Sequence, residues 1–102
     1  MQDNACTGTP CKGSVYRINY QSMTVEGVAA DALFQPHGII VDADNQYAWI
    51  ANRNVDATGI PPHHGSTCSG NDGFLSRLDL STGQLTDFRL VLSTDTYGID
   101  AR

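Results

Sequence analysis

The sequence predicts an all-β chain, and three observations favour this fold class. Apolar and polar residues alternate over short segments, which is the pattern of strands with one buried face. Sequences rich in Gly, Asn, Asp and Ser separate these segments and predict turns. No segment of useful length repeats apolar residues at the spacing of a helix. At 102 residues, the chain is expected to form one domain or part of one.

The central part of the chain predicts a β-hairpin. Residues 38–41 (GIIV) form a continuous apolar run, which is typical of a strand covered on both faces. Residues 46–52 (QYAWIAN) are rich in β-forming residues and follow a turn at residues 42–45. The acids Asp42 and Asp44 are spaced as in a calcium loop, but the glycine and the final acid of such a loop are missing. We therefore interpret this segment as a turn held by hydrogen bonds from backbone amides to aspartate.

Two segments of the chain repeat each other at an offset of 60 residues. Residues 13–42 align with residues 73–102 without a gap. Residues 14–20 alternate, with Tyr16, Ile18 and Tyr20 on one face, and residues 74–80 repeat this strand pattern. The matched pairs are Arg17 with Arg77, Ile18 with Leu78, Asn19 with Asp79, Tyr20 with Leu80, Val25 with Leu85, Val28 with Phe88, Gly38 with Gly98 and Ile39 with Ile99.

A long connection accounts for the large offset. Residues 54–72 (NVDATGIPPHHGSTCSGND) have the composition of a loop with no strand of its own. Removing about 18 residues leaves a unit near the roughly 40–45 residues of a β-propeller blade.

Three short motifs stand in order along this unit. They are Pro36-His37-Gly38-Ile39, Trp49-Ile50-Ala51-Asn52 and LSRLDLSTG at residues 75–83. In these motifs the chain resembles the YVTN type of β-propeller repeat, in which a P-x-G strand precedes a strand ending in Asn and a hairpin with Asp and Thr-Gly. The resemblance covers residues 13–102. The long insertion departs from the pattern, as does Gln21-Ser22-Met23 where Thr-Gly is usual.

The resemblance implies one complete four-stranded antiparallel blade with strands of its two neighbours. Residues 1–30 would hold outer strands of the preceding blade, residues 31–92 the complete blade with its insertion loop, and residues 93–102 the inner strand of the next blade. The implied strands are residues 14–20, 24–29, 37–43, 46–53, 74–80, 85–91 and 97–102.

Other propeller blades are the partners that this division implies, because one blade leaves its edges and faces open. They could belong to the same longer chain, of which this would be the C-terminal part, and we favour this interpretation. The alternative is a self-assembling structural subunit that completes its blades between chains.

Charge and cysteine content narrow the partners and the location. The net charge is −5 and Lys and Arg do not cluster, which argues against nucleic acid. No apolar run is long enough for a membrane span. Cys6, Cys11 and Cys68 stand in loop-like sequence, which suits a disulfide in an oxidising, extracytoplasmic compartment: periplasm, cell surface or medium. We prefer the pair Cys11–Cys68, since the repeat brings their loops to similar places on adjacent blades; Cys6–Cys11 is the alternative.

The insertion is the candidate binding loop, through Pro61, Pro62, His63 and His64. An alternative is a redox protein that holds Cu or Zn with His37, His63, His64 and Cys68. Adjacent histidines chelate poorly, and the metal-binding motifs CxxC and HExxH are missing from the sequence, so we expect no cofactor.

Catalysis is not expected, because neither GxSxG nor a grouping of Ser, His and acid is present. We interpret Arg17 and Arg77 as side chains whose stems cover a sheet face, and Asn19 and Asp79 as turn residues, although the arginines could instead contact a ligand. Trp49 is expected in the core, with sugar stacking as the alternative. The sequence thus predicts a non-catalytic, exported propeller module that presents loops to a protein or a surface glycan.

Overall fold

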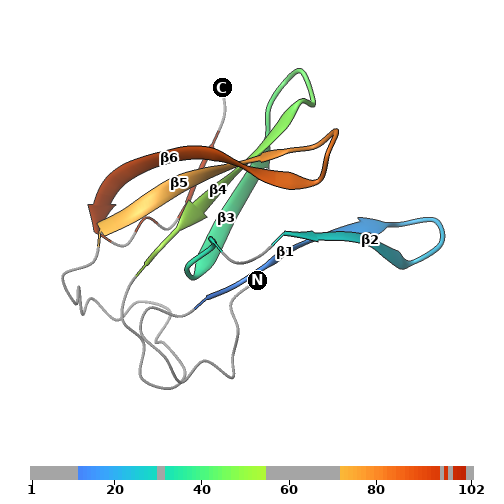
Figure 1. Cartoon of the computed structure of the whole chain (residues 1–102), viewed down its shortest axis with the longest axis horizontal. Coiled ribbons are helices and arrows are strands. Elements are labelled where there is room, and N and C mark those ends of the chain that lie inside the picture. Colours follow the sequence, from blue (N-terminus) through green and yellow to red (C-terminus); the bar gives the residue numbers. More distant parts are fainter. Residues whose placement is uncertain (1–11, 30–31, 55–71, 95, 97, 101–102) are drawn as a thin grey trace.

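The computed structural model describes residues 12–29, 32–54, 72–94, 96 and 98–100, and this part of the chain is all-β with no helix. It forms two antiparallel sheets (Figure 1). The two-stranded sheet pairs β1 (Val15–Asn19) with β2 (Thr24–Ala29). The four-stranded sheet contains β3 (Pro36–Val41), β4 (Tyr47–Asn52), β5 (Asp72–Asp79) and β6 (Gln84–Thr94).

The strands of the larger sheet follow one another in chain order, β3-β4-β5-β6, each antiparallel to the next. This confirms the predicted all-β class and the four-stranded antiparallel sheet, with strand ends within a few residues of those expected. The sheet is open along β3 and β6, and its identity as a propeller blade stays a prediction.

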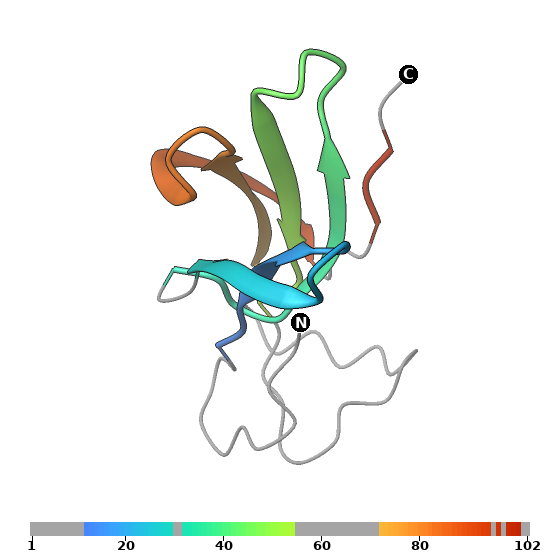
Figure 2. The same cartoon turned by 90° about the vertical axis from the view of Figure 1, so that its right-hand side faces the viewer.

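The last predicted strand, at residues 97–102, is not formed where the structure describes it. Residues 98–100 are not paired with any described strand. In Figures 1 and 2 this segment nevertheless runs in the same direction as β3.

The turn between β3 and β4 is held as predicted by an aspartate. Asp42 Oδ1 accepts hydrogen bonds from the amides of Gln46 (2.9 Å) and Tyr47 (3.2 Å). Asn45 takes the left-handed conformation (φ 54°), which asparagine tolerates better than most residues. The carboxylate that resembled a calcium ligand therefore binds backbone amides.

The β1–β2 and β5–β6 turns match residue for residue. Asn19 Oδ1 accepts hydrogen bonds from the backbone amides two and three residues after it, at 3.0 and 3.1 Å. Asp79 Oδ1 accepts the equivalent two hydrogen bonds, at 2.8 and 3.2 Å. Both turns end in the left-handed region, at Met23 (φ 56°) and Gly83 (φ 70°). Both strand pairs also have a register shift one or two residues before the turn. Asn19 and Asp79 thus start the hairpin turns, as predicted.

The four-stranded sheet has two different faces. On the first, which we name the hairpin face, Ala48, Ile50 and Leu78 are buried under the β1–β2 hairpin (Figure 2). Ala29 and Leu33 complete this core, and Val15, Leu80 and Leu85 pack against it. Tyr47, Trp49, Arg77 and Phe88 lie on the opposite face, which we name the aromatic face, because neighbouring residues of a strand alternate between faces.

Two expectations about burial were wrong. Residues 38–41 are not covered on both faces: Ile39 is 52% exposed and Val41 is 44% exposed. The reason is that β3 is an edge strand, and the β1–β2 hairpin leaves part of the hairpin face open beside it. Trp49 is half-buried on the aromatic face and is not a member of the core cluster.

Candidate functional site

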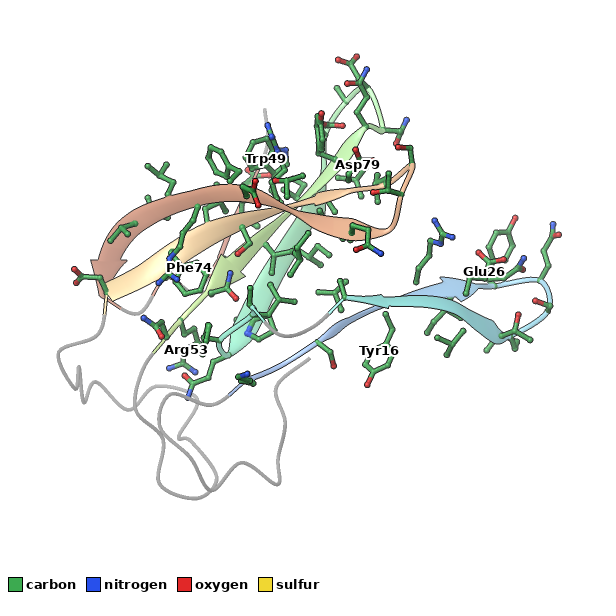
Figure 3. All side chains as sticks on the ribbon, viewed as in Figure 1. Tyr16, Glu26, Trp49, Arg53, Phe74 and Asp79 are labelled. Atoms are coloured by element: carbon green, nitrogen blue, oxygen red, sulfur yellow. The ribbon has the colours of Figure 1, made fainter. Side chains whose placement is uncertain are left out.

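The candidate site lies at the end of the four-stranded sheet where β3 begins, β4 ends and β5 begins. We name it the loop end, because the long connection leaves and returns there. Figure 3 shows Arg53 and Phe74 toward this end and Asp79 toward the other. Residues 55–71 lie outside the described residues, so the site is built from what holds their two ends.

Asn52, the asparagine of the YVTN-like motif, is the central clamp of the loop end. Its side chain is fully buried (0% exposed). Its Oδ1 accepts the amide of Phe34 (3.0 Å), and its Nδ2 donates to the Ile50 carbonyl (3.1 Å) and to Ser76 Oγ (3.0 Å). One amide therefore joins the chain entering β3 to both β4 and β5. The sequence marked this position through the motif, but its contacts are with residues far along the chain.

The base of the long connection is fixed by three further hydrogen bonds. The amides of Arg53 and Asn54 donate to the carbonyls of Gln35 and Phe34, both at 3.1 Å. Asn54 Nδ2 donates to the carbonyl of Asp72 at 2.8 Å, which ties one end of the connection directly to the other. Asn54 adopts a left-handed φ of 52°, which turns the chain out of β4.

Gln35 is an unusual residue of the loop end that sequence reasoning missed. It is fully buried, has a left-handed φ of 53°, and neither atom of its side-chain amide has a hydrogen-bond partner among the described residues. Arg53 beside it is also buried, at 3% exposed. An unpaired buried amide costs about 1–3 kcal/mol. No local sequence signal distinguishes this glutamine from a solvated loop residue.

The predicted site residues are only partly placed. His37 is exposed near the start of β3, at the loop end, which agrees with its predicted position at the start of a strand. The other proposed metal ligands, His63, His64 and Cys68, lie outside the described residues, so the four-residue metal site stays a prediction. The same holds for Pro61, Pro62, Cys6 and Cys11. Among the described residues, no three His, Cys, Asp or Glu side chains are grouped as for a metal.

The aromatic face carries a cluster around Arg77. Its guanidinium carbon lies 4.5 Å from the ring centre of Tyr47, 5.7 Å from that of Trp49 and 5.2 Å from that of Phe88. The rings of Trp49 and Phe88 meet edge to face at 5.2 Å. Nε of Arg77 donates to Thr86 Oγ1 (3.3 Å). Arg77 thus covers a sheet face, as the sequence indicated, and its cation–π contacts hold the rings in place.

An apolar groove of about 190 Å³ separates the β1–β2 hairpin from the hairpin face. Val15 and Ala29 line one side, and Ile39, Val41 and Leu78 line the other. Most of the described residues that line the groove are apolar, so it is suited to apolar contact.

No described helix is long and apolar enough to cross a membrane. Comparisons of the chain with protein families, with curated proteins and with solved structures find no match.

Proposed function

We propose that the chain is a non-catalytic module of a YVTN-type β-propeller that presents its long connection for binding another protein or a surface glycan. The disulfide suggested by its loop cysteines would place this activity outside the cytoplasm. The four-stranded antiparallel sheet is the scaffold, and the loop end is the binding end.

The hydrogen bond between Asn54 and Asp72 is the observation that carries this proposal. It closes the base of the long connection at 2.8 Å. Residues 55–71 therefore start and end at neighbouring points at the same end of the sheet. The turns at the other end of the sheet, at residues 42–46 and 80–83, are short and are held by their own hydrogen bonds. A long loop held on a rigid scaffold is typical of a binding function.

Loop replacement tests the proposal. Residues 55–71 are exchanged for Gly-Asn-Gly, which keeps Asn54 and Asp72 in place, and both proteins are applied to a glycan array and to immobilised surface proteins of the source cell. We expect unchanged circular dichroism and loss of the binding that the wild-type chain shows. A control variant with Gly-Gly in place of Ala43-Asp44 alters the opposite end and should bind normally. Binding that survives the loop replacement would contradict the proposal.

Self-assembly is a second candidate, favoured by apolar side chains exposed on both sheets. Ile18 and Val25 of the two-stranded sheet are 56% and 58% exposed, and Leu90 of the larger sheet is 48% exposed. Exposed apolar residues on the outer faces of both sheets are what a second copy of the chain would cover.

A further inference from the structure

The two repeated hairpins, β1–β2 and β5–β6, carry an arginine at the same position before the turn. Nε of Arg17 points to its own hairpin, 3.6 Å from Glu26 Oε2. Nε of Arg77 does the same, 3.3 Å from Thr86 Oγ1, and positions 26 and 86 are equivalent at the offset of 60. Among the described residues, Nε of each arginine is thus engaged within its own hairpin.

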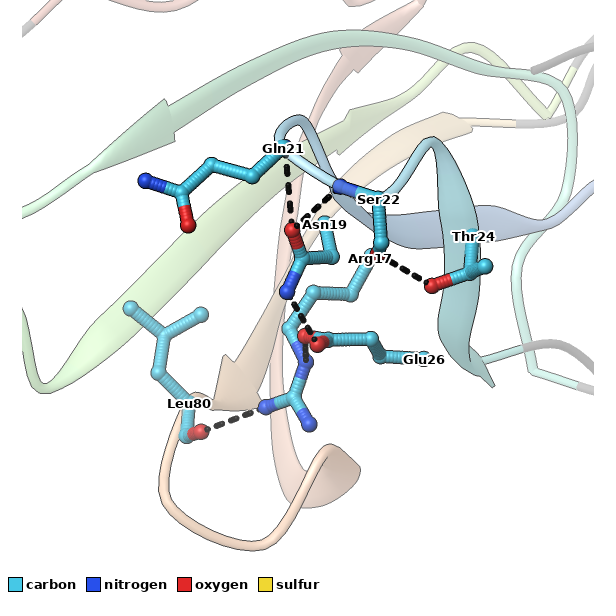
Figure 4. A network of polar contacts seen from close by, with 7 residues as sticks. All are labelled: Arg17, Asn19, Gln21, Ser22, Thr24, Glu26 and Leu80. Atoms are coloured by element: carbon cyan, nitrogen blue, oxygen red, sulfur yellow. Dashed lines mark hydrogen bonds and ion pairs between the residues drawn. The ribbon is translucent and has the colours of Figure 1, made fainter.

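Arg17 uses a terminal nitrogen to bind the neighbouring unit of the repeat. Its Nη1 donates to the main-chain carbonyl of Leu80, in the β5–β6 turn, at 3.3 Å (Figure 4). Next to this bond, Val15 and Ala29 of the β1–β2 hairpin pack into the cluster that contains Leu78. One unit therefore contacts the next through an arginine–carbonyl bond and a small apolar patch.

The described residues offer Arg77 no such neighbour. Among the described residues, its terminal nitrogens have no hydrogen-bond acceptor, and its guanidinium lies over the rings of the aromatic face. Beside it Leu75 pairs with Leu90, as Val15 pairs with Ala29 in the first hairpin. Leu90 is 48% exposed, whereas Ala29 is only 8% exposed. This half of the contact is present but uncovered.

The outer face of the β1–β2 hairpin is the matching half, and it too is uncovered. Ile18 pairs with Val25 as Leu78 pairs with Leu85, and Tyr20 occupies the turn position of Leu80. Ile18 is 56% exposed, Val25 58% and Tyr20 81%, whereas Leu78 is 7% exposed. Tyr16 lies on the same face and points away from the four-stranded sheet in Figure 3.

We propose that the aromatic face of one copy packs on the outer face of the β1–β2 hairpin of a second copy. Leu90 then packs on Ile18 and Val25 of the second copy. Arg77 donates to the main-chain carbonyl of its Tyr20. The contact repeats the one already present inside the chain, and both of its surfaces belong to this chain. Two different surfaces meet, so assembly proceeds head to tail. This proposal rests on the self-assembly candidate and not on the binding loop.

Two substitutions to aspartate, one on each surface, test the contact. Ile18→Asp blocks the hairpin surface and Leu90→Asp blocks the aromatic face, and both side chains are exposed in a single copy. We expect light scattering to show concentration-dependent association of the wild type, weakened at least about 30-fold by either substitution, since each buries an unpaired carboxylate. An equimolar mixture of the two variants retains one intact contact, and it should form a discrete heterodimer.

Two further variants complete the experiment. Ile39→Asp places the same charge at an equally exposed apolar residue outside the contact, and it should associate like the wild type. Arg77→Met keeps the stem over the rings and removes the donor, and it should weaken association about 10-fold. Circular dichroism checks folding, and Val25→Asp replaces Ile18→Asp if that variant does not fold. A wild-type chain that stays monomeric overturns self-assembly as a whole. Association that survives both blocking substitutions, or a mixture that stays monomeric, overturns this contact alone.

Discussion

The matched turns of the two hairpins place a glycine and a methionine in the same left-handed conformation. The energetic effect of this conformation can therefore be tested by adding a side chain in one turn and removing one in the other. Gly83 has φ of 70° and Met23 has φ of 56°. We consider the substitutions Gly83→Ala and Met23→Gly. The first introduces a β-carbon in the β5–β6 turn, and the second removes the side chain from the β1–β2 turn.

The expected magnitudes follow from two opposing terms. A residue with a β-carbon pays about 1–2 kcal/mol in the left-handed region. Glycine loses more conformational entropy than alanine on folding, which lowers stability by about 0.4–1 kcal/mol. A β-carbon at Gly83 meets no atom within 4 Å, so no clash adds to the strain. Met23 is 78% exposed, so its removal sacrifices little packing. Gly83→Ala should therefore lower the free energy of unfolding by about 0.5–1 kcal/mol, and Met23→Gly should raise it by about as much.

Urea denaturation followed by the fluorescence of Trp49, the single tryptophan, measures both changes at constant m-value. Gly27→Ala is the matched control, because a β-carbon there also meets no atom within 4 Å and φ is not positive. This control should lose no stability. If Gly83→Ala behaves like Gly27→Ala, or if Met23→Gly destabilises the chain, the equivalence of the two turns is refuted.

Three polar groups give further predictions. The hydroxyl and the amide of Ser81 donate to Asp79 and hold its pKa below its usual value. Stabilisation from Asp79 is therefore complete above that usual value and is lost as pH falls through the lowered pKa, so melting temperatures below about pH 4 should fall less in Asp79→Asn than in the wild type. Arg17→Met should accelerate hydrogen exchange in β1 and β2 about 3- to 10-fold by removing the bond to the β5–β6 turn, and unchanged rates would contradict this role. Gln35→Met should raise the free energy of unfolding by about 1–2 kcal/mol, as measured in urea, whereas a decrease would show that its amide is paired in solution.

The hairpins could be predicted from sequence because each turn is determined within about five residues. Asp42 binds amides four and five positions ahead, and Asn19 and Asp79 bind amides two and three positions ahead. The strands on either side alternate or are rich in β-forming residues, so their order followed from the turns. These are local relations that a single sequence records.

Coverage of the faces could not be predicted in the same way, because it depends on elements far apart in the chain. The run at residues 38–41 is apolar enough for a strand with two covered faces, yet Ile39 and Val41 lie beside an open groove. Trp49 is as suitable for a core as for the aromatic cluster in which it lies. In the loop end, Asn52 reaches Phe34 and Ser76, which are 18 and 24 residues away.

The Asn54–Asp72 hydrogen bond also has a consequence for how the chain can evolve or be engineered. Since Asn54 and Asp72 hold the two ends of the connection together, the residues between them can be lengthened or replaced at a cost that grows only slowly, about 0.6 kcal/mol for each doubling of length. Changes between residues 54 and 72 should therefore have little effect on the stability of the sheet. Residues 55–71 are therefore the natural place to graft a new recognition sequence onto this scaffold, with Asn54 and Asp72 kept as fixed boundaries.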